Sequence, residues 1–433
     1  MTRHFAAALL GSTALVFSVS AFADDLVTND RAGLASAPNK LVFALPAWQS
    51  HTFSAVPAWA DGFKKAYTDF ISAHPDWQIE FQYQGGDSAQ VAASLIEQAK
   101  AGQAPDCAAL DSFVLQQVID AKVLKPLTPY LRDQTADAFP FVKTAVTGPD
   151  GEVYALWWTT DVKILFRDTS VVPDAPKTWD ELKADALKSK DAGKEGLLFN
   201  GARWEGTTFD WLPNFWSQGG ELVDASGKPI FGDAANRDKF VKAVSYYKDL
   251  VDSGAAPKRV LTIKQYQDME AAAISGTTAL FIGNNGDWGN LKSGMSADDF
   301  KHWAFSAIPG PTPDQQASGA GGWVFTSTAT DPKKVEFCAD VIKDIYSVKA
   351  NQIMGFLPTE TGSYDKYPEF STSDNKAFAD ALLKAKVRPG LAIYPEISNQ
   401  IQIMLGDVLS GTKSVDEAVD TAYKASLDAY AKL

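Results

Sequence analysis

The chain has 433 residues, of which 45% are hydrophobic, 21% charged and 12% aromatic, and this ordinary globular composition excludes disordered, collagen-like and low-complexity proteins. Forty Lys and Arg against 53 Asp and Glu give a formal net charge of −13 with no basic run to offset it, so no nucleic-acid partner is expected. Two Cys and four His do not suffice for a disulfide scaffold or a metalloenzyme, and no metal or cofactor is predicted.

Residues 1–23 have the pattern of a secretory signal peptide. A short basic region precedes an almost wholly apolar stretch, residues 5–19, and the small residues Ala21 and Ala23 flank a cleavage site. A membrane anchor is disfavoured because the apolar stretch is short and is interrupted at 11–13. No Cys lies near the cleavage site, so no lipid anchor is expected and the mature chain is predicted to be soluble and exported.

The first half of the mature chain alternates strand and helix patterns. It predicts a strand at 41–45, a helix at 56–71, a strand at 77–83, a helix from Asp87 or Ser88 to 102, and a buried strand at 105–110. This order is typical of parallel βαβ units, and it predicts an α/β lobe that a strand-rich stretch at 153–167 ends.

The second half repeats this alternation with a different spacing. Helices are predicted at 204–218, 236–253 and 335–346, and two more are predicted to follow capping boxes. Short strands are predicted at 278–282 and 323–327. The capping boxes are Thr178 with Glu181 and Ser414 with Glu417. The order predicts a second α/β lobe but not how the chain divides between the two lobes.

The two cysteines, Cys107 and Cys338, can pair in an oxidising compartment. A sequence gives no connectivity, and the favoured interpretation is two separate buried thiols that pack as small hydrophobic groups.

Motifs of the common enzyme classes are absent from the sequence. It contains no G-x-S-x-G, no H-E-x-x-H and no G-x-x-x-x-G-K-[ST], and Gly319-Ala320-Gly321-Gly322 lacks the third Gly and the preceding strand of a dinucleotide loop. Two carboxylates for glycoside hydrolysis need a spatial separation that the sequence does not give. An exported carbohydrate-active enzyme therefore stays open as an alternative, and a structural or adhesion protein is a third.

Aromatic residues are abundant, with 12 Trp, 13 Tyr and 25 Phe, and most Trp adjoin turns, small residues and acids or amides. A single such Trp usually packs in the core. As a group they favour a carbohydrate ligand, because aromatic rings match the apolar face of a sugar and polar side chains match its hydroxyl groups.

Several short motifs, each weak alone, occur in a characteristic order: AGQAPD at 101–106, GEVYALW at 151–157, PKTWDEL at 176–182, GG at 219–220, TALFIG at 278–283 with Trp288, GGW at 321–323, and LSG at 409–411 with SVDEA at 414–418. Through them the chain resembles, over essentially its whole mature length, the extracellular solute-binding proteins of family 1, which are the sugar-binding components of ABC importers related to maltose-binding protein.

The resemblance implies an α/β, two-lobed periplasmic-binding-protein (Venus-flytrap) fold of type II, each lobe a mostly parallel sheet flanked by helices, with a ligand cleft between the lobes. It places crossings near 157–160, 321–323 and 386–389, so that lobe 1 holds 24–157 and 324–386 and lobe 2 holds 158–323 and 387–433. It also implies a periplasmic monomer without enzymatic activity or catalytic residues, which delivers a saccharide to the membrane subunits of an ABC permease.

The resemblance further implies a set of ligand contacts in the cleft: Trp48, Gln49, Ser50, His51, Asp87, Asp111, Trp157, Thr160, Asp161, Arg203, Thr207, Trp211, Asp287, Trp288, Gly322, Trp323, Arg388 and Tyr394. Asp111 is the preferred polar contact. His51 reads equally well as a solvated loop residue, Asp87 and Asp111 as helix N-caps, and Asp161 as a solvent-facing acid. Because the set combines acids with Arg203 and Arg388, a neutral saccharide and an anionic derivative (phosphate, sulfonate or uronate) both stay open.

Overall fold

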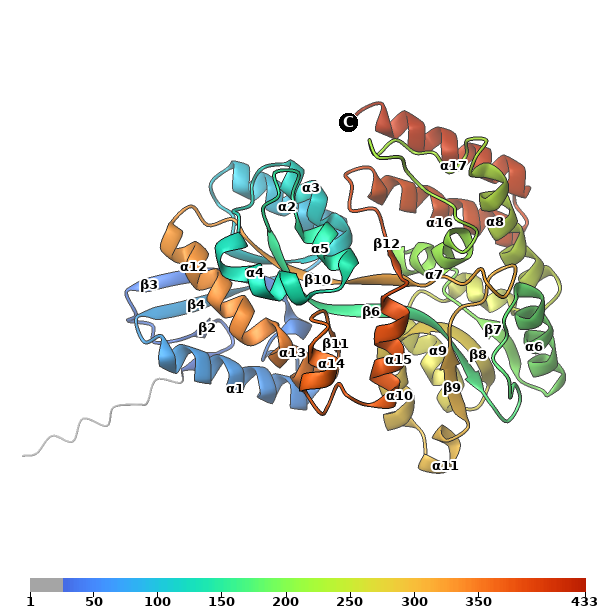
Figure 1. Ribbon diagram of the computed structural model, residues 1–433, viewed down its shortest axis with the longest axis horizontal. Helices are drawn as coiled ribbons and strands as arrows, with labels where there is room; N and C mark the ends of the chain where they lie inside the picture. The colour runs from blue at the N-terminus through green and yellow to red at the C-terminus, as the bar shows by residue number, and fades with distance from the viewer. Residues whose placement is uncertain (1–25) are drawn as a thin grey trace, which may run out of the picture.

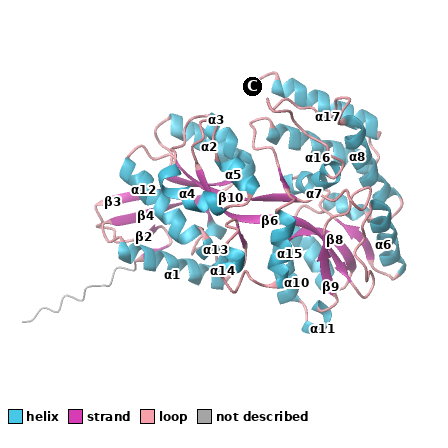
Figure 2. Cartoon of the chain, in the orientation of Figure 1, coloured by secondary structure: helices cyan, strands magenta, loops and turns pink. Residues whose placement is uncertain are grey.

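The computed structural model describes residues 26–433, and the predicted signal peptide lies outside them. Two α/β lobes lie side by side, and two long strands, β6 (Ala155–Asp168) and β10 (Gly319–Ser327), run between them (Figure 1). In each lobe helices surround the strands (Figure 2). Between residues 26 and 433, none of the helices combines the length and the apolar character needed to cross a membrane.

The first lobe is built mainly from the N-terminal part of the chain. Its elements are β1 (Val27–Thr28), β2 (Arg31–Ala32), β3 (Asn39–Pro46), η1 (Ala47–Gln49), α1 (Pro57–Ala73), β4 (Trp77–Gln84), α2 (Ser88–Lys100), β5 (Cys107–Asp111), η2 (Ser112–Val114), α3 (Leu115–Asp120), α4 (Thr128–Asp137) and α5 (Pro140–Val146).

The second lobe follows β6. Its elements are α6 (Trp179–Asp191), β7 (Glu195–Leu198), α7 (Glu205–Trp216), α8 (Arg237–Asp252), η3 (Lys258–Thr262), α9 (Tyr266–Ile274), β8 (Thr278–Asn284), α10 (Asn285–Gly294), α11 (Ala297–Phe300) and β9 (Trp303–Ser306).

After β10 the chain visits both lobes again. The remaining elements are α12 (Pro332–Val341), η4 (Ile342–Tyr346), α13 (Val348–Met354), β11 (Leu357–Pro358), α14 (Ser363–Lys366), α15 (Ser373–Leu382), β12 (Lys386–Val387), α16 (Tyr394–Ser410) and α17 (Val415–Tyr430). The helices α12 and α13 lie on the first lobe, whereas α16 and α17 lie on the second (Figure 1). Ion pairs from Arg237 to Asp416 and Asp420 join α8 to α17.

The strand pairing confirms the predicted βαβ unit, since β3 pairs in parallel with both β4 and β5. The two crossing strands differ from the expected mostly parallel arrangement, because β10 runs antiparallel to β5 and β6, and β6 antiparallel to β8 and β9. The sheets are therefore mixed. β6 leads from the first lobe to the second and β10 leads back, so these two crossing strands run in opposite directions.

Local signals explain where several helices begin. The side chain of Asp87 accepts from the Gln90 amide at 2.9 Å and caps α2, and the side chains of Thr178 and Ser414 cap α6 and α17 in the same way. The predicted helix at 335–346 is divided, because α12 ends at Val341 and a single π-helical turn, η4, follows it.

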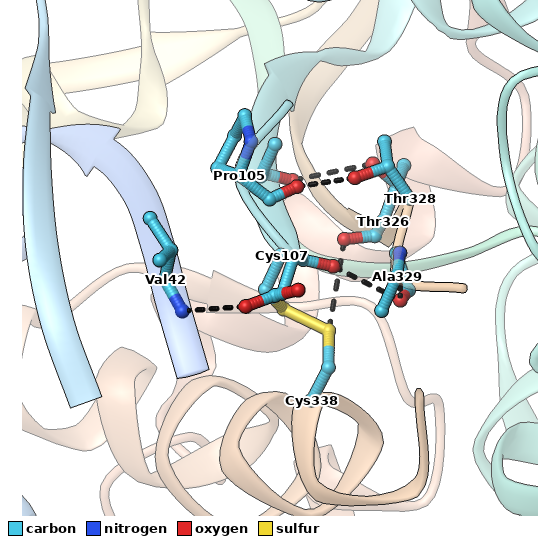
Figure 3. Close-up of a disulfide and its surroundings, with 10 residues drawn as sticks. Val42, Pro105, Cys107, Thr326, Thr328, Ala329 and Cys338 are labelled. Atoms are coloured by element: carbon cyan, nitrogen blue, oxygen red, sulfur yellow. Dashed lines mark hydrogen bonds between the residues drawn. A yellow bond between two sulfur atoms is a disulfide. The ribbon is translucent and has the colours of Figure 1, made fainter. Parts of the chain in front are cut away.

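Cys107 and Cys338 form a disulfide, so the favoured expectation of two separate thiols is wrong. The bond ties the first residue of β5 to α12, beside the neighbouring strands β3 and β10 (Figure 3). It closes a sequence separation of 231 residues, which the pattern of the sequence around either cysteine does not reveal.

Candidate functional site

A cavity of about 1180 Å³ lies between the two lobes. Its walls come from the turn after β3, the N-terminus of α2, the end of β5, the middle of β6 and β10, the start of α7, the junction of β8 and α10, and the segment between β12 and α16. The cavity slightly exceeds the volume of about 300–1,000 Å³ that is usual for small-molecule pockets. It is the natural candidate for a ligand-binding cleft.

The structure brings half of the predicted contacts to this cavity. They are Trp48, Asp87, Asp111, Thr160, Asp161, Arg203, Gly322, Trp323 and Arg388. They come from both lobes and from both crossing strands, so residues that are far apart in the sequence share one wall.

Aromatic rings line both sides of the cavity. On the first-lobe side the indole of Trp48 meets the Trp323 ring edge-on at 5.3 Å and lies 6.3 Å from Phe356. On the second-lobe side Trp204 and Tyr266 meet edge-on at 5.8 Å. All five rings line the cavity and contribute apolar surface to it.

Arg388 links the two lobes at one end of the cavity. Its guanidinium donates to Asp111 at 3.2 Å, at the end of β5, and to Glu205 at 3.0 Å, at the start of α7. The same group lies over the ring of Phe113, at 4.5 Å, and the ring of Phe209, at 4.2 Å. Each lobe thus contributes one carboxylate and one aromatic ring to a single buried cation.

The carboxyl of Asp111 titrates unusually high in this cluster. Burial raises its pKa to about 6, and this outweighs the opposing attraction of Arg388. The neighbouring carboxylates of Glu205 and Asp161 add to the rise. Asp111 also accepts from the Phe113 amide at 3.4 Å, so it caps η2 and lines the cavity at the same time.

A second buried cation, Lys163, lies in the wall formed by β6. Its ammonium lies 3.5 Å from Asp161 and 3.4 Å from Asp210, and 4.4 Å from the ring centres of Phe209 and Tyr266. Burial raises the pKa of Asp210, and the nearby charge of Lys163 partly counteracts this rise. The carboxylate of Asp161 has partners within the protein and does not only face solvent, because it also accepts a hydrogen bond from the Gly321 amide at 2.9 Å.

Gly322 lines the cavity, and the packing of the two crossing strands requires its missing side chain. A Cβ on Gly322 would lie 1.9 Å from the carbonyl oxygen of Thr159 and 2.4 Å from the indole nitrogen of Trp157. Glycine at this position therefore lets β10 pack against β6.

The other half of the predicted contacts lie away from the cavity, beginning with the turn after Trp48. Gln49 and Ser50 are buried behind the turn, and the Ser50 hydroxyl donates to Ala47 at 2.9 Å. His51 binds the carbonyl oxygen of Thr28 through Nε2 at 2.7 Å, and burial lowers its pKa. It is neither a solvated loop residue nor a residue that lines the cavity.

Four more predicted residues fill the interior. The Trp157 indole donates to the Thr159 carbonyl at 2.8 Å, the Thr207 hydroxyl bonds Ala202, and Trp211 is fully buried between Phe215 and Phe240. Tyr394 is buried behind the cavity, where its hydroxyl donates to Glu205 at 2.7 Å.

Asp287 and Trp288 support the second lobe. Asp287 is buried and closes a capping box with Asn284 at the start of α10. The Trp288 ring packs against Phe300 and Phe305, and its nitrogen donates to Asp374 of α15 at 2.8 Å. A position next to a turn does not distinguish these packed rings from those that line the cavity.

Several residues that line the cavity are not among the predicted contacts, namely Phe53, Phe113, Lys163, Trp204, Glu205, Phe209, Tyr266 and Phe356. Strand alternation offers a signal for Lys163, since it lies two residues after Asp161 on the same strand face. Trp204 and Glu205 directly follow Arg203. The remaining aromatic residues carry no local signal, because only the packing of the two lobes brings them together.

Known proteins resemble the chain in sequence and in fold. A family model described as bacterial extracellular solute-binding protein matches residues 58–379. The sn-glycerol-3-phosphate-binding periplasmic protein UgpB of Yersinia enterocolitica is 23% identical over 82% of this chain and 85% of its own length. A maltooligosaccharide ABC transporter solute-binding lipoprotein of Streptococcus pneumoniae is 24% identical over 65% and 66%, respectively.

A solved structure has the same fold. The maltose-bound MalE3 of T. maritima superposes with a TM-score of 0.74 at 23% identity, and the alignment covers 89% of this chain and 98% of MalE3. The two-lobed architecture is thus that of maltose-binding proteins, which confirms the predicted fold class.

Proposed function

The chain belongs to the bacterial extracellular solute-binding proteins, and on this premise we propose that it captures a neutral mono- or oligosaccharide in the cavity between its lobes and delivers it to an ABC importer. Members of this family are the solute-binding components of transport systems. The cavity is therefore expected to bind a solute and release it again. The proposed location is the periplasm, and the proposed partners are the membrane subunits of the importer.

The charge of the cavity walls carries the choice of a neutral ligand. Four carboxylates (Asp87, Asp111, Asp161, Glu205) and three cations (Lys163, Arg203, Arg388) line the cavity. Each of the two buried cations already has two carboxylate neighbours. An anionic ligand would have to compete with these carboxylates, whereas the hydroxyl groups of a sugar can donate to them.

The cavity also offers donors and stacking surfaces. The donors on its walls include the guanidinium of Arg203. Rings such as Trp48, Trp323 and Tyr266 supply apolar faces. A sugar ring needs this combination, because its hydroxyl rim and its C–H face require different partners.

We further propose that the ligand stabilises closure of the lobes about the crossing strands. The predicted lobe boundaries remain part of this proposal, with one adjustment. The helix α15 packs on the second lobe through Phe378, whose ring stacks on Phe305 at 4.3 Å, and through Asp374. The third crossing therefore fits better before Ser373 than near Lys386.

Calorimetric titration of the mature protein tests the proposal. The ligand panel should contain maltose, maltotriose and glucose as neutral sugars, and sn-glycerol 3-phosphate and glucuronate as anions. We expect saturable binding of at least one neutral sugar and recovery of that sugar unchanged after dissociation. Binding of the anions alone contradicts the neutral class, and cleavage of a bound glycoside contradicts a pure binding function.

An anionic sugar derivative is the second candidate, and one observation favours it. Arg203 lines the cavity, bonds Asn399 at 2.7 Å and makes no ion pair within residues 26–433. If the ligand is anionic, Arg203→Ala should abolish its binding. If the ligand is a neutral sugar, the same variant should leave its affinity largely intact.

A further inference from the structure

The turn that carries Trp48 into the cavity is held from behind by a buried tyrosine. Trp48 is the middle residue of η1, a single turn that directly follows β3. The turn closes on itself, since the Ser50 amide and hydroxyl both donate to the Ala47 carbonyl, at 3.1 Å and 2.9 Å. These local bonds shape the turn, but they do not fix it to the rest of the lobe.

Two tyrosine hydroxyls attach the turn to the rest of the lobe at Gln49, whereas His51, two residues further on, is bound separately to the Thr28 carbonyl. Tyr346 donates to the Gln49 carbonyl at 2.6 Å, and its oxygen lies 2.6 Å from the Tyr67 hydroxyl. Because Tyr346 uses its single proton on the carbonyl, Tyr67 must be the donor to Tyr346. All three residues are fully buried, and the Gln49 side-chain amide makes no hydrogen bond to any described residue. The carbonyl of Gln49 is therefore the anchor point.

The π-helical turn η4 places Tyr346 at this position. Tyr346 is its last residue, where the chain leaves the register of α12, and π-helical turns are rare and concentrate at functional sites. The Tyr346 ring is fixed by Phe325, at 4.2 Å, and by Phe43, at 5.7 Å. The hydroxyl thus reaches Gln49 from a rigid surround.

The same ring supports the Trp48 side chain indirectly. The Trp158 ring meets Tyr346 edge-on at 5.7 Å and lies 6.4 Å from the Trp48 ring. Tyr346 thus reaches the turn along two routes, through the backbone of Gln49 and through the indole of Trp158. Neither Tyr346 nor Tyr67 lines the cavity.

We propose that Tyr346, assisted by Tyr67, is a positioning residue that holds the η1 turn and so sets the orientation of Trp48 as a stacking platform for the ligand. Only the link between Trp48 and ligand binding rests on the proposed function. The mechanical part, the fixing of the turn, stands on the contacts alone. Preorganisation of this kind raises affinity because the bound geometry already exists in the free protein.

Hydrogen–deuterium exchange of the ligand-free protein tests the mechanical part. Tyr346→Phe keeps the ring and removes only the hydroxyl, and we expect the amides of residues 47–53 to exchange about tenfold faster. Tyr67→Phe should have a smaller effect, because the bond from Tyr346 to Gln49 remains. The matched control is Tyr246→Phe, which removes a buried hydroxyl bonded to the Trp179 carbonyl on the second lobe. Equal exchange of this segment in Tyr346→Phe and the control overturns the proposal.

Maltotriose titration tests the link to binding. Tyr346→Phe should weaken maltotriose binding by about tenfold in the wild-type background and should add nothing in a Trp48→Ala background. Additive losses, or a lowered melting temperature with unchanged affinity, contradict a positioning role. If the wild type binds no saccharide, the proposed function fails, while the exchange experiment still decides whether Tyr346 holds the turn.

Discussion

Trp323 and Trp288 show how two tryptophans with similar sequence surroundings take different roles. Trp323 lines the cavity, whereas Trp288 packs between helices of the second lobe. We expect Trp323→Ala to weaken saccharide binding by about 1–3 kcal/mol, because a stacking face is lost. Trp288→Ala should lower the melting temperature but leave the affinity nearly unchanged. Calorimetric titration and scanning calorimetry measure the two effects, and an equal loss of affinity in both variants would contradict the placement.

The raised pKa of Asp111 makes the stability of the protein depend on pH in a defined window. The pKa rises from 3.8 to about 6 on folding, so between these values the folded state binds a proton that the unfolded state does not. This contribution to stability is complete below about pH 4 and is lost as the pH rises through 6. At pH 8, where the carboxyl is ionised, its contribution to the free energy of unfolding is up to about 3 kcal/mol lower than at pH 4.

Asp111→Asn removes this titration while keeping the shape of the side chain. The melting temperature of the variant relative to the wild type should therefore rise as the pH is changed from 4 to 8 in scanning calorimetry. The control is Asp331→Asn, which removes an N-cap acid of α12 remote from the cavity. A difference between Asp111→Asn and the wild type that does not vary with pH would mean that Asp111 titrates normally.

At the residue scale, a larger share of the predicted polar residues than of the predicted aromatic residues lines the cavity. Asp111 lies at the end of β5 and Asp161 within β6, and the family resemblance, through the motifs at 101–106 and 151–157, pointed to these places. Trp157 and Trp211 satisfied the same rule of lying near turns or polar residues, yet they point into the core. Which side of an element becomes the cavity wall depends on contacts with the other lobe, and a single sequence does not encode these visibly.

At the scale of elements, the disulfide joins β5 to α12 across a separation of 231 residues. A crosslink over so long a loop mainly restricts the unfolded chain. We expect the paired variant Cys107→Ala with Cys338→Ala to lose about 2–5 kcal/mol of stability, measured by chemical denaturation. Ligand affinity should not change, because neither cysteine lines the cavity. A loss of affinity in a folded variant would contradict the separation of this bond from the site.

The helices and strands of the βαβ unit followed the sequence closely because their signals are local. The predicted strand at 41–45 is β3, the helix at 56–71 is α1, and the capping residue Asp87 begins α2. The antiparallel insertion of β10 between β5 and β6 was not predictable in this way. Its neighbours β5 and β6 are more than 150 residues away in the sequence, so no period or turn near β10 records this pairing.

At the scale of the whole molecule, Arg388 is a fixed link between the lobes. Its two ion pairs and its two aromatic neighbours come one each from the first lobe, through Asp111 and Phe113, and from the second, through Glu205 and Phe209. Without the guanidinium the two carboxylates would face each other unpaired, and two like charges at close range repel. The balance between open and closed lobes should therefore depend on this one side chain.

Arg388→Met tests this dependence, because methionine keeps an apolar chain between the two rings and removes the charge. Spin labels at Lys100→Cys in α2 and Thr421→Cys in α17 report the distance between the lobes, since both positions are exposed and lie on opposite lobes (Figure 1). Labelling is selective because the native cysteines are bonded to each other. We expect a longer and broader distance distribution in the ligand-free Arg388→Met protein.

Arg203→Met is the control, because Arg203 also lines the cavity but pairs with no carboxylate among residues 26–433. The distance distribution of this variant should match that of the wild type. Equal distributions in all three proteins would show that the lobes are held by the crossing strands alone.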